Sequence, residues 1–131
     1  MVVDTSVLVA IFREENEAPA FIDVVDQAEA ALVSVITVVE TMSVLCGQRI
    51  GATRDQVERL VAKLGLSTEG VDVAQQELAI TALLEFGKGR HPAKLNLADC
   101  FAYALAKSRG LPLLFKGDDF ARTDIVPAWR P

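Results

Sequence analysis

The chain has 131 residues, of which 51% are hydrophobic, and its formal net charge is −5. This length fits a single domain spanning residues 1–131 with its own core, and the hydrophobic content excludes a disordered chain. No run of about 18 apolar residues lacks a charge or a helix breaker, and the N-terminus lacks basic residues, so neither a membrane span nor an export signal is expected.

Short apolar runs alternate with helical patterns in the first part of the sequence. "MVVD" predicts a strand, and Thr5 or Ser6 can cap a helix that runs to about Phe12. A helical pattern covers 18–29, and "AALVS" predicts a second strand. The pattern over 36–49 predicts a helix that is apolar on almost all sides and therefore buried.

The same alternation continues to the end of the chain. "TRDQVERLVAKLGL" predicts a helix with Thr53 as its N-cap, and "GVDV" predicts a third strand. Further helices are expected over 74–86 and 97–108, separated by the polar, basic loop "GKGRHPAKLN". "PLLF" predicts a fourth strand and "IVPAW" a short fifth, which gives an α/β fold with a central parallel sheet of four to five strands between helical layers.

Cysteines and charges indicate the setting of the protein. Cys46 and Cys100 lie in apolar helical patterns without metal-ligand spacing, and we expect buried thiols in a cytoplasmic protein. Residues 1–85 hold 14 acids and 5 bases, whereas residues 86–131 hold 4 acids and 8 bases. This asymmetry indicates either one electropositive face or an ordinary solvated helix surface.

Five acidic residues occupy positions that can converge on one edge of the sheet. Asp4 directly follows the first strand, and Asp118 and Asp119 follow the fourth. Asp99 lies in the first turn of the helix after the basic loop, and Glu40 is the only charged residue in "VITVVETMSVLC". Ligands of parallel sheets bind beyond the carboxyl ends of the strands, where these residues are expected.

Carboxylates gathered in one cleft repel each other, and a divalent cation removes that repulsion. Mg²⁺ and Mn²⁺ prefer oxygen ligands and support phosphate-ester chemistry, whereas His91, beside Pro92 in a polar loop, gives little support for zinc. Each acid also has a simple structural alternative. Asp4 can cap a helix, Asp99 can stabilise a helix N-terminus, Asp118 and Asp119 can be turn residues, and Glu40 can form a buried ion pair.

Four segments together resemble the motifs of PIN-domain proteins, and more closely the VapC-type toxin ribonucleases of bacterial toxin–antitoxin pairs. They are "MVVDTSVLVA", "VVETMSVL", "GKGRHPAKLNLADCFAYALAK" and "PLLFKGDDFARTDI". The likeness runs from Val2 to Ile125 and implies an α/β/α sandwich around a parallel sheet.

The resemblance also implies a Mg²⁺- or Mn²⁺-dependent endoribonuclease that cleaves single-stranded or loop RNA. Asp4, Glu40 and Asp99 match the three acidic metal-site positions of the family, and Asp118 or Asp119 supplies the fourth catalytic acid. The family also places a small polar residue after the first Asp, a position that Thr5 or Ser6 fills here. The expected partners are an RNA substrate, a small VapB-type antitoxin that covers the cleft, and a second copy in a homodimer.

The basic loop and its surroundings supply candidate contacts to the RNA backbone. The candidates are Lys88, Arg90, His91, Lys94 and Lys116. Such contacts to phosphates give affinity that depends on salt and little on sequence.

Three other interpretations compete with the nuclease. A phosphatase with an aspartyl nucleophile expects a second Asp two positions after the first, where this chain has Ser6. A receiver domain expects paired acids after its first strand and a phosphoacceptor after its third, whereas Asp72 lies inside the expected third strand. A PIN-fold protein that binds without catalysis would retain the acids with no use for them.

Overall fold

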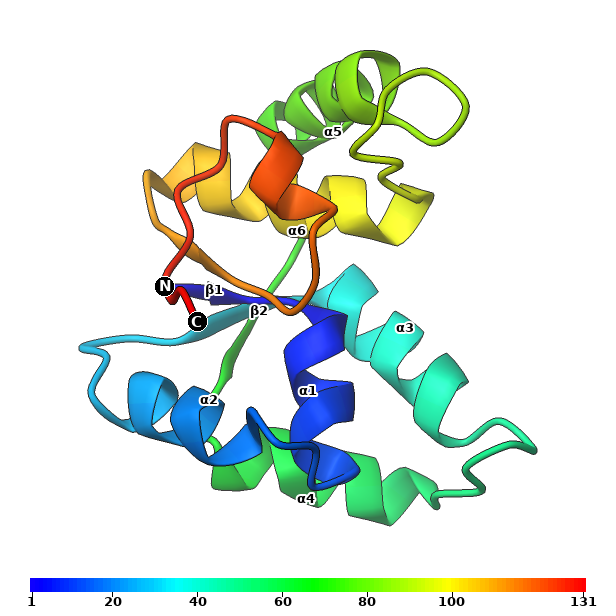
Figure 1. Cartoon of the computed structure of the whole chain (residues 1–131), viewed down its shortest axis with the longest axis vertical. Coiled ribbons are helices and arrows are strands. Elements are labelled where there is room, and N and C mark those ends of the chain that lie inside the picture. Colours follow the sequence, from blue (N-terminus) through cyan, green and yellow to red (C-terminus); the bar gives the residue numbers. More distant parts are fainter.

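A central sheet of four short parallel strands organises the chain, and the computed structural model describes all residues 1–131 (Figure 1). The strands are β1 (Val2–Val3), β2 (Leu32–Ser34), β3 (Ser67–Glu69) and β4 (Leu113–Leu114), in the order β3-β2-β1-β4. The helices are α1 (Thr5–Phe12), α2 (Ala18–Asp26), α3 (Val35–Leu45), α4 (Arg54–Lys63), α5 (Val73–Phe86) and α6 (Leu97–Arg109). The expected α/β fold with a central parallel sheet is confirmed.

Alternating side chains of the strands enter two separate cores. Val2 and Leu113 pack with α5 and α6, whereas Val3 and Leu114 pack on the opposite face with α1 and α2. All four side chains are fully buried, as expected for a parallel sheet with helices on both faces. None of the helices is long and apolar enough to cross a membrane.

Two of the strand predictions were wrong. The third strand lies at Ser67–Glu69, before "GVDV", because Asp72 instead caps α5 by accepting a hydrogen bond from the Gln75 amide at 2.8 Å. "IVPAW" forms no strand, and only an isolated bridge joins Pro127 to Leu113. A proline cannot donate to a ladder, which limits the pairing of this segment.

The expectation that the helix at 36–49 is buried all round was also wrong. The helix ends at Leu45, and Val39 and Val44 are 66% and 42% exposed. α3 packs against α1 and α6 at one end of the sheet, so its outer side remains uncovered (Figure 1). Cys46 follows this helix and is exposed rather than buried, whereas Cys100 in α6 is buried as expected.

Gly87 ends α5 and shapes the start of the basic loop, because its carbonyl accepts hydrogen bonds from the amides of Arg90 and His91. A Cβ at this position would overlap the carbonyl oxygen of Leu83. Gly87→Ala is therefore expected to lower the free energy of unfolding by about 1–3 kcal/mol in urea titrations. Gly70→Ala is the control, because a Cβ there would meet nothing within 4 Å. Equal stability of the two variants would contradict this account of the loop.

Candidate active site

The strand order places a topological switch between β1 and β4. The chain leaves β1 for β2 and β3 on one side, and returns to pair β4 with the other side of β1. Asp4 follows β1 and Asp119 follows β4, so both lie at the carboxyl edge where ligands bind in such sheets. The beginnings of α3 and α6 also lie close to this edge (Figure 1).

Asp4 is the most buried of the candidate acids, at 4% exposure. It caps α1, and its Oδ2 accepts hydrogen bonds from the Ser6 amide at 2.9 Å and the Ser6 hydroxyl at 2.6 Å. Its Oδ1 is buried without any hydrogen-bond partner. Burial raises the pKa of Asp4, the bonds from Ser6 oppose that rise, and the charge of Glu40 adds to it. Helix capping therefore accounts for one carboxylate oxygen only.

Glu40 reaches the same edge from α3. Its Oε2 accepts a hydrogen bond of 2.6 Å from the hydroxyl of Thr5, in the first turn of α1. No lysine or arginine pairs with Glu40, so the alternative of a buried ion pair is wrong. Thr5 thus holds the glutamate in place without neutralising its charge.

Asp99 lies in the first turn of α6 and forms a capping box with Asn96. The Asp99 Oδ2 accepts from the Asn96 amide at 2.8 Å, while the Asn96 Oδ1 accepts from the Asp99 amide at 2.8 Å. Burial raises the pKa of Asp99 to about 7, and the charges of Asp4, Glu40 and Asp119 contribute to the rise. The capping bond opposes it. We call Asp4, Glu40, Asp99 and Asp119 the acidic cluster, because the charges of the other three act on Asp99.

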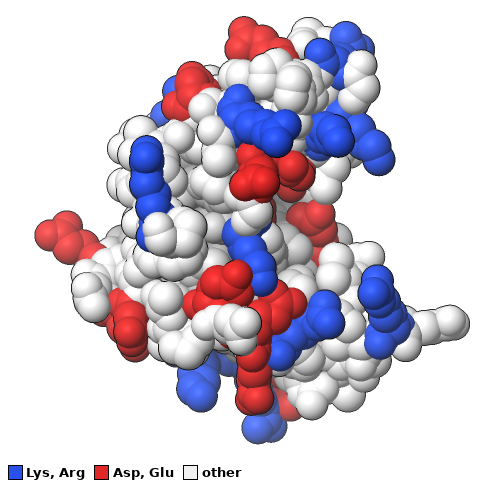
Figure 2. Space-filling view, viewed as in Figure 1, with Lys and Arg blue, Asp and Glu red and all other residues white.

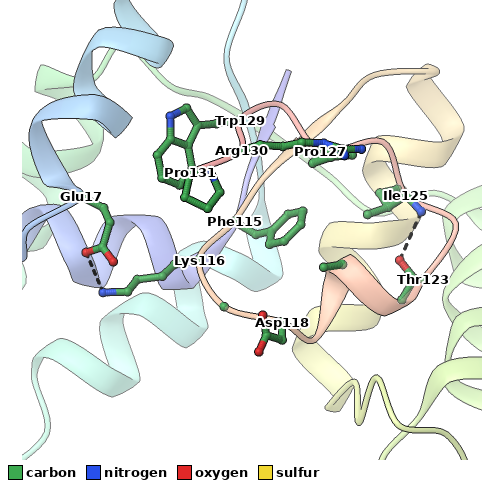
Figure 3. Close-up of a pocket in the computed structure, with 12 residues that line it drawn as sticks. Glu17, Phe115, Lys116, Asp118, Thr123, Ile125, Pro127, Trp129, Arg130 and Pro131 are labelled. Atoms are coloured by element: carbon green, nitrogen blue, oxygen red, sulfur yellow. Dashed lines mark hydrogen bonds and ion pairs between the residues drawn. The ribbon is translucent and has the colours of Figure 1, made fainter.

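Asp118 and Asp119 face different surroundings although they are adjacent in sequence. The charge of Asp119 acts on Asp99. Asp118 instead lines a surface cavity of about 710 Å³, with Trp129 and Lys116 among its other walls (Figure 3). The sequence did not decide which of the two is the fourth acid of the site. In the structure, Asp119 is the one whose charge acts on Asp99.

The chemistry of the acidic cluster suits a hard cation. All its donors are carboxylate oxygens, and Asp4 offers the buried oxygen that lacks a partner. No three acidic, imidazole or thiol groups of the chain stand close enough together to ligate one ion directly. A cation at this site would therefore take at most two of the carboxylates as direct ligands and keep waters at its other positions, as Mg²⁺ can.

The candidate RNA contacts divide into free and engaged side chains. Lys88, Arg90 and Lys94 are exposed on the loop between α5 and α6, and none of them forms an ion pair. His91 accepts a hydrogen bond at Nδ1 from the Ala93 amide and packs edge-on against a phenylalanine of α5. Lys116 pairs with two glutamates, so its ammonium is already occupied.

The positive balance of 86–131 does not form one uniform face. Lys107 pairs with Asp124, and Arg109 pairs with Glu69. Figure 2 shows acidic side chains inside a hollow on one side of the molecule and basic side chains on the rims around it. The basic side chains therefore form separate patches around a hollow that contains acidic side chains.

Three contributors to the site were missed from the sequence. Asn96 could have been found, because its spacing to Asp99 is that of a capping box. Glu15 and Glu17 could not have been found in this way, because no local sequence pattern marks them. Their contact with Lys116 joins parts of the chain that are distant in sequence.

A PIN domain model matches residues 1–126 of the chain. This chain belongs to the PIN-domain family. Ribonuclease VapC42 of Mycobacterium tuberculosis is 41% identical to it over 133 residues, which cover 98% of each chain. Ribonuclease VapC28 of the same organism is 39% identical over 129 residues, which cover 98% of this chain and 97% of the relative.

Solved structures share the fold. One is Mycobacterium tuberculosis VapC20, described as a sarcin-ricin loop cleaving toxin. It has a TM-score of 0.75 at 18% identity, and the match covers 99% of this chain and 98% of that chain. A toxin–antitoxin complex from Klebsiella pneumoniae has a TM-score of 0.70 at 20% identity with the same coverage.

Proposed function

We propose that this PIN-domain protein is a Mg²⁺- or Mn²⁺-dependent endoribonuclease that cleaves single-stranded or loop RNA as the toxin of a toxin–antitoxin pair. The observation that carries the proposal is the buried, unpartnered Oδ1 of Asp4 within a cluster of uncompensated carboxylates. The relatives named as VapC ribonucleases, which match almost the whole chain, support the same reaction.

Asp4 and Asp99 would hold the cation, and Glu40 and Asp119 would add negative charge around it through water. When bound, such an ion lowers the pKa of water and stabilises charge on a phosphoryl oxygen. The chain itself supplies orientation, because Ser6, Thr5 and Asn96 each hold one oxygen of an acid. The opposite oxygen of each acid is left free for the ion or its waters.

RNA would be held through its phosphates at the rim of the acidic cluster. Lys88, Arg90 and Lys94 are the best placed, because they are exposed and unpaired, and His91 lies in the same loop. Binding of this kind weakens steeply with salt. A small VapB-type antitoxin protein is the proposed partner, and the homodimer and cytoplasmic location stay predictions.

A PIN-fold binding protein without activity is the remaining alternative. The phosphatase is not favoured, because the hydroxyl of Ser6 is bonded to Asp4 at the position where that family has its second acid. Release of phosphate from small esters, without cleavage of RNA, would restore the phosphatase.

The cleavage test uses two adjacent acids that have different surroundings. Wild type, Asp119→Asn and Asp118→Asn are incubated with end-labelled single-stranded RNAs and Mn²⁺, with a chelator in parallel. We expect chelator-sensitive cleavage by wild type and Asp118→Asn. We expect a loss of about tenfold or more in kcat for Asp119→Asn, because of these two adjacent acids it is Asp119 whose charge acts on Asp99. If several RNAs stay intact with every metal, the nuclease proposal fails.

A further inference from the structure

We propose that Lys116 is a positioning residue: its ion pairs with Glu15 and Glu17 fix the end of β4, and its own amide thereby holds Ser6 and Asp4 in their working orientation. This inference rests on the proposed function. It replaces a phosphate contact by Lys116, which the sequence predicted, with a role inside the protein.

The side chain of Lys116 is clamped by the loop between α1 and α2. Its Nζ donates to the Oε2 of Glu15 at 2.6 Å and to the Oε2 of Glu17 at 2.9 Å. The side chains are only 34%, 27% and 35% exposed, so this three-residue ion pair is half-buried. Figure 3 shows Lys116 extended toward Glu17 along one side of the cavity. We call these three residues the lysine clamp.

The backbone of Lys116 points the other way, toward the acidic cluster. Its amide donates to the hydroxyl oxygen of Ser6 at 2.9 Å, and that hydroxyl donates to the Oδ2 of Asp4 at 2.6 Å. Because the Ser6 oxygen accepts from the amide, its single proton is directed to Asp4. The Oδ2 of Asp4 is thereby fixed, and the unpartnered Oδ1 is the oxygen left for the reaction.

The position of the clamp in the chain extends its effect to a second acid. Gly117 follows Lys116 with φ of 97°, which only glycine adopts readily, and Asp119 comes two residues later. Fixing Lys116 therefore sets the start of the turn that brings Asp119 toward Asp99. One lysine thus affects the placement of an acid after β1 and an acid after β4.

The existing ion pairs argue against Lys116 as a phosphate ligand. Two carboxylates lie within hydrogen-bonding distance of its ammonium, and Arg13 adds a longer ion pair to Glu15 at 3.6 Å. A phosphate would have to compete with both glutamates for the ammonium, and Glu17 would then lose its only basic partner. The free lysines and arginine of the basic loop carry no such penalty.

The test compares the two ways of breaking the lysine clamp. Lys116→Met removes the ammonium but keeps the amide, and the double variant Glu15→Gln/Glu17→Gln frees the ammonium. Lys116→Arg should retain the pairs and rescue activity. The matched control is Arg54→Met, which breaks an exposed ion pair with Glu58 on α4. Steady-state RNA cleavage gives kcat and KM, and amide hydrogen exchange at Lys116 gives a readout without RNA or metal.

We expect both disrupting changes to lower kcat by about ten- to a hundredfold with little change in KM, because a small misplacement of a reacting group is enough. The Lys116 amide should lose protection while the amides of α4 keep theirs. A triple variant that combines Glu15→Gln, Glu17→Gln and Lys116→Met should have a kcat no lower than that of Lys116→Met alone, because the three residues act as one unit.

Two results would overturn the proposal. If Glu15→Gln/Glu17→Gln lowers KM and keeps kcat while Lys116→Met raises KM, the lysine is a phosphate contact. If protection at Lys116 is unchanged in all variants, the clamp does not hold the strand end. An inactive wild type would refute the nuclease instead, and the exchange measurement would still decide the role of the clamp.

Discussion

Asp4→Asn is expected to reduce kcat for RNA cleavage by about 10³-fold, equivalent to about 4 kcal/mol of transition-state stabilisation. The amide keeps the shape of the carboxylate and can still accept the two bonds from Ser6. It removes the negative charge next to Glu40 and Asp99, and with it the capacity to hold a cation. The loss should therefore appear in the chemical step and not in folding.

The control for this variant is Asp72→Asn, since Asp72 is also a helix N-cap whose side chain accepts from a backbone amide. It lies outside the acidic cluster, so cleavage should stay at the wild-type rate. Steady-state cleavage with saturating RNA gives kcat, and urea unfolding gives the stability of each variant. If Asp4→Asn retains wild-type kcat, the central acid of the proposed site has been assigned wrongly.

The second large effect is on stability as a function of pH. In the folded protein the pKa of Asp99 is about 7, against 3.8 for an ordinary aspartate, and that of Asp4 is also raised. Between those pH values the folded state binds more protons than the unfolded chain, so stability falls as pH rises. Without added metal, the free energy of unfolding should drop by on the order of 2 kcal/mol from pH 4 to pH 7, after allowance for solvent screening.

Added Mn²⁺ should reverse this trend, because it binds the ionised carboxylates of the folded state. The rise in melting temperature on adding Mn²⁺ should be larger at pH 8 than at pH 5. Asp99→Asn should flatten the metal-free pH profile and reduce the shift with Mn²⁺. A profile that is the same in wild type and Asp99→Asn would show that Asp99 is not the group responsible for the pH dependence.

The sequence predicted those parts of the site that depend on local patterns. Asp4 and Asp99 lie at a strand end and a helix start, so their positions follow from the order of apolar runs and caps. The same reasoning failed for α3, since apolar composition does not say which sides of a helix are covered. Val39 is exposed because α3 lies at the end of the sheet.

The rest of the site depends on contacts between distant segments. The sequence pattern kept both Asp118 and Asp119 as candidates, with a slight preference for Asp118. Only the turn after Gly117 decides which of them approaches Asp99. The bond from Thr5 to Glu40 joins α1 to α3, and nothing in either segment alone predicts it. For a single acid in an apolar segment, an ion pair is the simplest structural expectation. The sequence does not show that the hydroxyl of Thr5 is the actual partner of Glu40.

The placement of β4 also sets when the acidic cluster can exist during protein synthesis. β4 pairs directly with β1, yet Asp119 is translated long after Asp4, Glu40 and Asp99. A nascent chain that stops before β4 has three of the acids, an unpaired side of β1 and no lysine clamp. For a ribonuclease made on a ribosome, itself largely RNA, this order keeps the enzyme incomplete until nearly all of the segment described here has been synthesised.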